Sequence, residues 1–479
     1  MCMAIAWMIQ ILSLLLHTMI SELKGSDIRT LRLEKGVSQA KLAELSGIVQ
    51  AKISSWELGK DDITESAYIK LIKILDEIDE KKITQLKKKR YQKSNDINID
   101  IPKRNYQQTE RNTEYLNSLS ELESHFAEDN YRAKALSFFA GCGGLCYGAK
   151  AAGIKIVGTN ELVDNYKKVY SLNFDGCHFL PNDVREISKS DIDIILDKHG
   201  SIDIMLGGPP CQGFSLAGKR DVNDDRNTLF GDYLEISKYV QPKVILIENV
   251  RLLTSMKDPD GKFVKDRVIE TYDKLGYESQ FYVVNAKDYG VPQHRERVIF
   301  IGVRKDLKLK PSIPDTLFSD EDASLFNDKK APFTFGDAVS DLPYLESGEN
   351  DVNDPYHWAV KHPKHVLNWL IDVPQGKSAH DNDDPNLRPP SGYNTTYKRQ
   401  VWDEPGGTVA TTFGMISGCR NVHPIATRSM TIREALRLQS FPDSFQLTGS
   451  SGTIRTVIGN AVPPILGYHI SKHIVNTYM

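Results

Sequence analysis

The sequence predicts an α/β protein: a doubly wound sheet forms the main domain, a smaller domain follows it, and an all-α domain precedes it. Short apolar runs such as residues 202–206 and 243–247 stop at glycine, proline or a carboxylate, which is typical of buried parallel strands. Residues 28–75 instead carry apolar side chains at helical spacing. Residues 303–427 are rich in Pro and Asp and contain few regular signals. These three observations divide the chain.

Length and composition indicate a globular chain with more than one domain. The chain has 479 residues, of which 40% are hydrophobic and 26% charged, so two or three domains are expected. Its net charge of −3 argues against indiscriminate coating of nucleic acid, although a local basic groove is compatible with it. The six cysteines form no CxxC pair and no zinc-like cluster. We therefore expect a reducing, cytoplasmic compartment, no disulfide framework and no metal.

Residues 1–18 form an apolar extension. Residues 3–16 resemble the apolar core of a signal peptide, but no Lys or Arg occurs before Lys24 and no small-residue cleavage site follows,. The run is also short for a membrane span. We interpret it as an artefact of start-site choice, with Met19 as the alternative start, and we expect no membrane partner.

Residues 19–79 are predicted to form a helix-turn-helix domain. Gln39 begins a helical run that stops at residues 46–48, and a second run over residues 49–57 is closed by Gly59. Two short helices joined by a glycine-containing turn are the helix-turn-helix pattern, and this segment resembles the phage-repressor class. The resemblance implies that Gln39 touches phosphate and that the second helix enters the major groove of double-stranded DNA. The groove-facing residues would be Gln50, Lys52, Ser54 and Ser55.

Residues 80–133 are interpreted as a basic and polar linker. Residues 81–94 carry seven basic side chains and no acid. A run of like charges is usually a solvated tail, and contact with a DNA backbone is a further hypothesis. Residues 115–126 are expected to form a short helix before the main domain.

Residues 134–302 begin with a nucleoside-binding pattern. A predicted strand ends at Phe139 and runs into the glycine loop 140–144, where the backbone can approach a ligand closely,. Glu161 ends the next strand roughly twenty residues later, which suits a carboxylate that binds ribose hydroxyls. Asp183 and Val184 follow another strand end, where they would contact an adenine edge. A glycine loop alone is weak evidence, but together these positions indicate a doubly wound sheet that binds a nucleoside.

Cys211 is the candidate nucleophile. It follows a strand through Gly207-Gly208-Pro209-Pro210. Proline fixes φ and lacks a donor while glycine permits a sharp turn, so the loop holds Cys211 where open α/β sheets bind ligands. Most free cysteines are small buried hydrophobic residues, yet a cysteine in a rigid polar loop favours nucleophilic catalysis.

Charged residues follow two further predicted strands or loops. Glu248 ends the apolar strand 243–247, and a carboxylate there is costly without a partner or a task. Arg295 and Arg297 flank a glutamate before the strand 298–301. The two arginines could form a structural ion-pair cluster, or hold an anion or a base edge.

Residues from about 134 to the end resemble the DNA (cytosine-5)-methyltransferase family, because six blocks match in the family's order. The blocks are residues 139–144, 208–212, 248–250, 293–297, 433–443 and 459–464. A single block could arise by chance, whereas the ordered set is specific. Ser137 departs from a common Asp and His294 from a commoner Lys.

The resemblance implies an S-adenosylmethionine-dependent methyltransferase fold and methylation of DNA cytosine at carbon 5. Cys211 would add to carbon 6 of a cytosine flipped out of the duplex. Glu248 would engage ring nitrogen 3 and the amino group, Arg297 would hold the ring carbonyl, and Arg295 would buttress Glu248 or the cysteine loop. The cofactor residues implied are Phe139, Gly141, Gly143, Gly144, Glu161, Asp183, Val184, Pro209, Asn460 and Val462.

In this family, the position of residues 303–427 holds the target-recognition domain, and residues 428–479 would return to the catalytic domain and place the last helix beside the cofactor. Residues 406–412 resemble the recurring element of the recognition domain. Trp402, Thr408 and Arg420 are candidate DNA contacts, and so is Ser215 in the loop after Cys211.

Other methyltransferase classes fit the sequence less well. Enzymes that methylate exocyclic amines place a polar residue, Pro-Pro and an aromatic residue where this chain has residues 208–211. RNA cytosine methyltransferases usually carry a second cysteine in a Thr-Cys context, which is absent here. A transfer-RNA substrate is disfavoured by the long recognition region and by the added helix-turn-helix domain.

The remaining alternatives concern the amino-terminal domain. A transcriptional repressor on an inactive methyltransferase scaffold is the alternative from another functional class, and intact Cys211, Glu248, Arg295 and Arg297 argue against it. A double role is the favoured hypothesis: methylation that protects DNA from a cognate restriction enzyme, with repression of the chain's own promoter, by analogy with such modules in restriction–modification systems. The target sequence, the cognate enzyme, dimerisation through the helix-turn-helix domain and the native start are left open.

Overall fold

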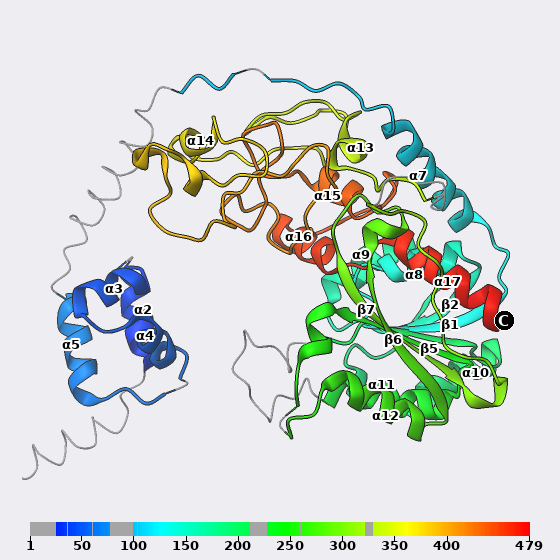
Figure 1. Cartoon of the computed structure of the whole chain (residues 1–479). Helices are drawn as coiled ribbons and strands as arrows, with labels where there is room; N and C mark the ends of the chain where they lie inside the picture. The colour runs from blue at the N-terminus through cyan, green and yellow to red at the C-terminus, as the bar shows by residue number, and fades with distance from the viewer. Residues whose placement is uncertain are drawn as a thin grey trace, which may run out of the picture. The chain divides into compact units, whose positions relative to one another are not determined.

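The computed structural model describes residues 25–35, 37–59, 61–76, 99–102, 104–210, 228–258, 260–320 and 329–479. Backbone contacts divide the chain into one unit, Met1–Ile99, and a second, Asp100–Met479 (Figure 1). The predicted apolar extension 1–18 and the basic run 81–94 lie outside the described residues. Within the described ranges, no helix is both long and apolar enough to cross a bilayer.

The first unit is all-α and contains the predicted helix-turn-helix. Its described helices are α2 Gly25–Glu34, α3 Gln39–Ser46, α4 Gln50–Glu57 and α5 Glu65–Asp76. Gly47 adopts φ 67° in the turn between α3 and α4, a conformation that costs glycine little. Apolar side chains from all four helices, including Ile28, Leu42, Ile53 and Leu71, form one small core. The unit therefore has a hydrophobic core of its own.

The second unit is built on a seven-stranded sheet with the strand order β3-β2-β1-β4-β5-β7-β6. The strands are β1 Ala133–Phe138, β2 Ile154–Thr159, β3 His178–Phe179, β4 Ile204–Gly207, β5 Val244–Val250, β6 Tyr277–Asn285 and β7 Glu296–Arg304. The first five strands pair in parallel, and β7 runs antiparallel to both β5 and β6. The predicted doubly wound α/β fold is confirmed, with an antiparallel strand near one edge.

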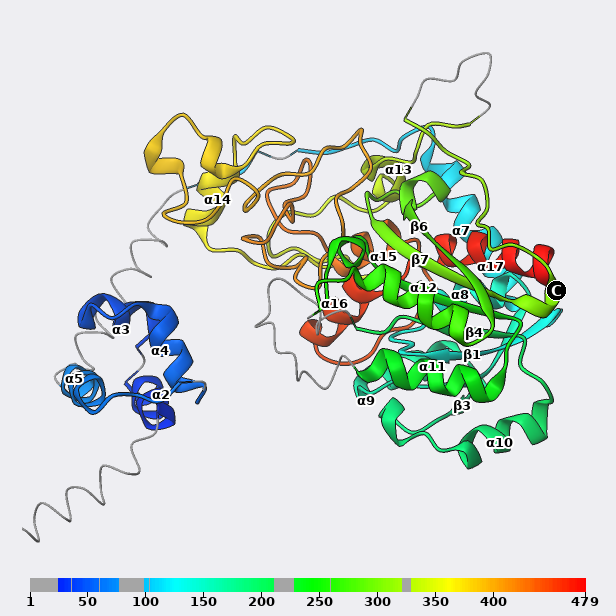
Figure 2. The same cartoon turned by 60° about the horizontal axis from the view of Figure 1, so that its bottom comes forward.

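Helices cover both faces of this sheet (Figures 1 and 2). Side chains alternate along β4, so that Ile204 and Leu206 pack in one core while Met205 packs in the other, as the period of a strand requires. The first face carries α7 Asn112–Ala127, α8 Gly144–Ala151, α9 Asp164–Asn173 and α17 Pro464–Tyr478. The other face carries α10 Lys189–His199, α11 Thr228–Val240 and α12 Val264–Lys274.

Helix α17 packs against α8, the helix that follows the glycine loop. A Cβ atom on Gly148 would lie 2.3 Å from the backbone nitrogen of Tyr468, so only glycine permits this approach. The carboxyl-terminal residues therefore complete the layer that carries the glycine loop.

The second half of the predicted linker belongs to the second unit. Helix α7 begins before the predicted residue 115, and its residues Tyr115, Leu119 and Leu122 are buried in the main core. Asn112 is buried and donates from Nδ2 to the carbonyl of Asp337. The polar composition of residues 99–112 concealed this packing, because many of their contacts are side-chain hydrogen bonds to distant backbone atoms.

The region after β7 contains little regular structure, as its composition predicted. Its short helices are α13 Phe335–Val339 and α14 Lys364–Leu370, and the chain then returns through α15 Ile432–Leu438 and α16 Ser451–Asn460. A separate small core around Leu370, Val373 and Val422 supports the loops near α14. Figure 2 shows these loops beside the sheet domain.

Candidate active site

A cavity of about 500 Å³ opens at the carboxyl ends of β1, β2, β4 and β5. It lies beside the β1–β4 junction, where the strand order reverses and open α/β sheets bind their ligands,. Most of the predicted cofactor residues line it, namely Phe139, Gly141, Gly144, Glu161, Asp183, Val184, Pro209, Asn460 and Val462. The sheet thus brings together residues more than 300 positions apart.

The glycine loop forms one wall of this cavity. Phe139 and Gly141 adopt positive φ angles of 55° and 59°, which is uncommon for a non-glycine residue such as Phe139. A Cβ on Gly144 would lie 2.2 Å from the carbonyl oxygen of Val462, so this glycine lets the returning chain reach the loop. Gly143 does not line the cavity, because it caps α8 at φ 91° with Phe174 beside it. Gly143 thus has a role in the turn, and its predicted contact with a cofactor stays a prediction.

Glu161 is held at the cavity by two backbone donors. Gly141 donates its N–H to Oε2 over 2.8 Å, and Val163 donates to Oε1 over 2.9 Å. Burial raises the pKa of Glu161 above its usual range, and the backbone donors oppose that shift. A carboxylate oriented in this way keeps free lone pairs for hydroxyl donors.

Asp183 caps the 3-10 turn Val184–Glu186 and pairs with Arg185. Its carboxylate accepts from the Arg185 backbone nitrogen at 3.0 Å and from the guanidinium Nε at 2.9 Å. The Arg185 side-chain hydrogen bond lowers the pKa of Asp183. The Asp183 carboxylate, which is predicted to contact adenine, is therefore already oriented by Arg185.

Glu248 and Arg297 meet at the other end of the cavity. Arg297 Nε lies 2.8 Å from Glu248 Oε1, and both side chains are mostly buried. A Cβ on Gly208 would lie 3.7 Å from Glu248 Oε2, so the loop after β4 runs directly over the carboxylate. Asn249 donates from Nδ2 to the carbonyl of Pro209 over 2.9 Å. The turn that leads into Cys211 is thereby tied to the end of β5, whereas Cys211 and Ser215 lie outside the described residues.

Arg295 does not contact Glu248 by any hydrogen bond among the described residues. Its side chain is fully buried and donates from Nη2 to the carbonyls of Gly459 and Ala461, at 2.9 and 2.8 Å. Burial and then the nearby Arg297 lower its pKa. The direct hydrogen-bonded partner of Glu248 is Arg297, and Arg295 supports the cavity wall on both sides of Asn460. The role predicted for Arg295, to buttress Glu248 or the cysteine loop, stays a prediction, because that loop lies outside the described residues.

Two family models match the chain. The model for C-5 cytosine-specific DNA methylases matches residues 133–476. The chain belongs to this methylase family. A helix-turn-helix model matches residues 28–82, so the methylase carries an amino-terminal domain of a DNA-binding class.

Relatives and a solved structure agree with this assignment. The methylase is 31% identical over 380 residues to the type II methyltransferase M.DdeI of Desulfomicrobium norvegicum, with 71% of this chain and 88% of the relative covered. It is 35% identical over 344 residues to M1.HphI of Haemophilus parahaemolyticus, covering 71% and 86%. An E. coli prophage protein assigned as a DNA modification methyltransferase shares 25% identity and a TM-score of 0.56, covering 72% and 99%.

Methylation by this family depends on S-adenosylmethionine, and the cavity suits such a group. The carboxylate of Glu161 faces a cavity that Leu162, 61% exposed, also lines. No atom lies within 4 Å of a Cβ placed on Gly141, so a ligand could approach this backbone closely. Hydroxyl groups could donate to the Glu161 carboxylate, and an aromatic ring could pack on Leu162,.

Sequence reasoning missed several cavity residues of the methylase. Leu162 is a large apolar side chain that stays exposed in a polar loop, and its place directly after Glu161 was the available signal. Asn160 donates from Nδ2 to the carbonyls of Pro181 and Asn182, which ties the β2 and β3 loops together. No local pattern predicts such contacts between loops.

The candidate DNA contacts of the recognition region have different environments. Thr408 is exposed and donates from Oγ1 to the carbonyl of His294 over 2.6 Å. Arg420 adopts φ 47° and its side chain lies near Gly407. Trp402 is only 8% exposed and packs against Tyr106 and Phe335, so the prediction that it contacts DNA is wrong.

The predicted DNA-facing residues of the first unit lie on α3 and α4. Gln50 and Lys52 are exposed, and Ser54 is half-buried. Ser55 donates to Asp61 Oδ2 at 2.7 Å, and Lys52 lies 3.3 Å from the same carboxylate. Gln39 donates from Nε2 to Glu57 at 2.8 Å, so its side chain is already bound within the unit.

Proposed function

We propose that this methylase transfers a methyl group to carbon 5 of a flipped-out cytosine through a covalent Cys211 adduct, at one short DNA sequence. The observation that carries the proposal is the ion pair of Glu248 with Arg297 beneath the turn that leads into Cys211. This pair lines the same cavity as Glu161 and the glycine loop. The proposed ring-binding carboxylate and the cavity thus share one sheet edge, and the turn that precedes Cys211 ends there.

In this proposal Cys211, Glu248 and Arg297 each have a defined part in the chemistry. The Cys211 thiolate bonds to cytosine carbon 6, and the electron pair of the 5–6 double bond becomes available at carbon 5. Glu248 binds ring nitrogen 3 and the amino group, and stabilises charge as the ring accepts the thiolate. Arg297 orients Glu248 and reaches the ring carbonyl. Bound S-adenosylmethionine supplies the methyl group to carbon 5.

Release restores the nucleophile. A base removes the proton from carbon 5, and the electron pair of that C–H bond re-forms the 5–6 double bond. The bond between carbon 6 and the Cys211 sulfur then breaks, and its electron pair returns to the thiolate. The cytosine must leave the base stack for these groups to reach it, and Thr408 and Arg420 are proposed to contact the duplex around it.

Residues that line the cavity would hold S-adenosylmethionine. Glu161 would bind ribose hydroxyls, Asp183 with Val184 would bind the adenine edge, and Leu162 would cover one face of the adenine ring. Phe139, Gly141, Gly144, Pro209, Asn460 and Val462 would form the surrounding surface. The methylase would act in the cytoplasm, in association with the nucleoid. Its methylation would protect that DNA from a cognate restriction enzyme.

We further propose that the helix-turn-helix unit represses the chain's own promoter, with dimerisation as one route to a two-site operator. The match over residues 28–82 and the exposure of Gln50 and Lys52 on α4 support this second role. The test is a double substitution, Gln50→Ala with Lys52→Ala, in the full chain. Loss of promoter binding with methylation retained is expected, and unchanged promoter binding would overturn the second role.

The catalytic proposal is tested by bisulfite sequencing. The full chain, Cys211→Ala and the matched control Cys419→Ala would be expressed in cells without cytosine methylation of their own. Cys419 is exposed and outside the cavity. Protected cytosines in one recurring sequence for the full chain and the control, and none for Cys211→Ala, are expected. Absence of protection with soluble wild-type protein would refute the activity and favour the inactive-scaffold repressor.

A further inference from the structure

Residues 104–111 form a strap along the recognition region, and the methylase family match gives this strap no role. The family match begins at residue 133, so the strap lies outside it. In Figure 1 this segment runs along the loops above α13 before it enters α7. Its side chains contact residues 331–345, 371, 402 and 423–425.

An arginine anchors each end of the strap. Arg104 donates from Nη1 to the carbonyl of Ile425 at 3.2 Å and from Nη2 to that of Ile371 at 2.6 Å. Arg111 donates to the carbonyls of Ala331 and Pro332, at 2.8 and 3.1 Å. The fork of a guanidinium can bridge two backbone segments at once, so Arg104 holds two separate loops in register, whereas Arg111 ties the strap to one segment.

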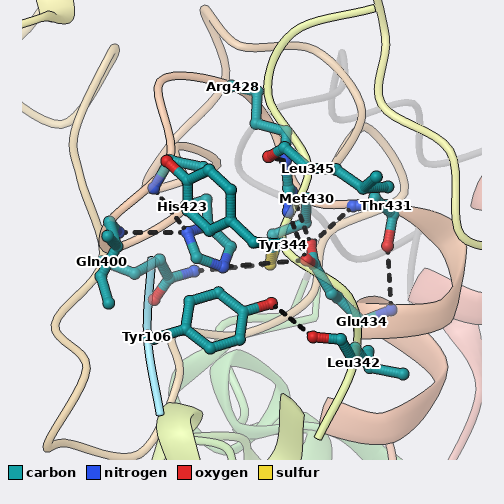
Figure 3. Close-up of polar contacts among 12 residues, drawn as sticks. Tyr106, Leu342, Tyr344, Leu345, Gln400, His423, Arg428, Met430, Thr431 and Glu434 are labelled. Carbon is teal, nitrogen blue, oxygen red and sulfur yellow. Dashed lines mark hydrogen bonds and ion pairs between the residues drawn. The ribbon is translucent and has the colours of Figure 1, made fainter. Parts of the chain in front are cut away.

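Tyr106 fills an aromatic box between these anchors. Its ring centroid lies 4.7 Å from Trp402, 5.6 Å from Tyr344 and 6.0 Å from His423, and these three side chains define the box. The hydroxyl donates to the carbonyl of Leu342 over 3.1 Å (Figure 3). Burial raises the pKa of Tyr106. The Tyr106 ring therefore packs among aromatic side chains, and its hydroxyl has a hydrogen-bond partner.

The rear of the box is rigid. His423 Nδ1 accepts N–H donors from Ile425 and Ala426, at 3.1 and 2.9 Å, so the proton lies on Nε2. That nitrogen faces Glu434 Oε1 at 3.7 Å, and the same carboxylate forms a buried ion pair with Arg428 (Figure 3). His423 is thus held by the N–H groups of Ile425 and Ala426, and its fully buried ring has little room to move into space that Tyr106 vacates.

The front of the box leads to the candidate DNA contacts. Trp402 lies between Tyr106 and Gly336, where a Cβ would be 2.6 Å from the indole. Two residues earlier, Gln400 accepts from the Gly407 N–H at 2.8 Å and donates to the carbonyl of Arg420 at 2.7 Å. Gln400 therefore joins the two segments that carry Thr408 and Arg420.

The same segment is bonded to the chain that enters β7. His294 donates its N–H to the carbonyl of Gly406 over 2.7 Å, and Val409 donates to Gln293 Oε1 over 2.9 Å. A displacement of Trp402 would consequently reach residues 406–409 and the start of β7. Arg297, the partner of Glu248, follows three residues after His294.

We propose that Tyr106 is a positioning residue for DNA recognition, which fills the aromatic box and so holds Thr408 and Arg420 against the start of β7. The proposal rests on the proposed function, because it takes Thr408 and Arg420 to contact target DNA. Removal of the ring leaves a cavity that the fixed His423 cannot close. The segment 402–409 then loses its register relative to β7. The residues that line the cofactor cavity keep their positions.

The test compares Tyr106→Ala and Tyr106→Phe in the full chain, with Tyr239→Ala as the matched control on α11. For Tyr106→Ala we expect the KM for target DNA to rise about tenfold, with kcat and cofactor affinity within about twofold of wild type. Tyr106→Phe keeps the ring and should behave as wild type, and so should the control. Amide hydrogen exchange at residues 294 and 406–409 should accelerate in Tyr106→Ala alone.

Two results would overturn the proposal. One is an unchanged KM together with unchanged exchange in Tyr106→Ala, and the other is an equal loss of kcat, cofactor binding and thermal stability. If Tyr106→Ala does not fold, Arg104→Gln should raise the KM with the same exchange pattern, and a wild-type KM there would refute the idea. A wild-type chain that methylates no DNA would refute the proposed function instead. Hydrogen exchange in Tyr106→Ala would then still decide whether Tyr106 holds residues 406–409 in place.

Discussion

Ser429 donates its backbone N–H to Nε2 of His362 over 3.2 Å. That nitrogen must therefore be unprotonated, and the proton of the neutral ring lies on Nδ1. Burial and then the nearby Arg428 lower the pKa of His362 from 6.5 to about 4. The bond joins residues 358–362 of the recognition region to the segment that enters α15, and it exists only while the imidazole is neutral.

Stability of the second unit should therefore fall on acidification. The folded pKa of His362 lies below its unfolded value, so its contribution is present above about pH 6.5 and is lost as the pH falls toward about pH 4,. At roughly 1.4 kcal/mol per unit this amounts to about 3 kcal/mol at most. Urea unfolding at about pH 7.5 and about pH 5 should show a smaller loss for His362→Gln than for wild type; equal losses would contradict this.

Glu248→Gln should abolish turnover without loss of the fold. The substitution removes the charge that pairs with Arg297 and the carboxylate that would engage the cytosine ring, so kcat should fall at least about 100-fold. The matched control is Glu296→Gln, since Glu296 is an exposed partner of Arg251 at the start of the neighbouring strand β7. Single-turnover methylation measures the loss of activity, and cofactor titration measures whether the fold and its cofactor site are retained. Activity close to wild type in Glu248→Gln would contradict the assigned role.

Gly144→Ala should destabilise the second unit and weaken cofactor binding together. Its Cβ would lie 2.2 Å from the carbonyl oxygen of Val462, and such overpacking costs about 1–3 kcal/mol. Gly231→Ala in α11 is the control, because no atom lies within 4 Å of its Cβ and helical alanine is favoured by about 1 kcal/mol. Thermal unfolding should move in opposite directions for the two variants.

Glu57→Gln should unfold the first unit and spare the second. Arg32 forms two hydrogen bonds with Glu57, from Nε at 2.6 Å and from Nη2 at 2.8 Å, in a buried setting. Breaking one partner of a buried pair costs about 3–5 kcal/mol, which a core of this size cannot easily compensate. Limited proteolysis should cut first within residues 25–76, and methylation should continue. Equal protection of both units would contradict this.

Local sequence patterns predicted the parts of the fold that depend on local forces. The runs 202–206 and 243–247 became β4 and β5, and the spacing of residues 39–57 became α3 and α4, because burial of one strand or helix face leaves a period in the sequence. The glycine loop, Glu161 and Glu248 lie at strand ends, so their convergence followed from the topology of parallel sheets,.

The long-range contacts left no such pattern. Tyr106 and Trp402 are about 300 residues apart, and nothing near either predicts that one covers the other. Trp402 was a candidate DNA contact because it lies in the recognition region that the family resemblance implies, although its ring packs against Phe335. Arg295 was predicted as an active-site cation, and its hydrogen bonds to the carbonyls of Val409, Gly459 and Ala461 were not foreseen. Side-chain hydrogen bonds to distant backbone atoms have no sequence signature.

The place of Asn460 and Val462 in the cavity wall, with α17 packed on α8, also constrains how the chain folds during synthesis. The glycine loop emerges from the ribosome more than 300 residues before the segment that closes its cavity. Until then the α8 surface around Gly148 has no cover, and exposed apolar surface is prone to aggregation. A chain truncated before α17 should therefore depend on chaperones and bind no cofactor, so that messages cut short at the 3′ end yield inactive protein.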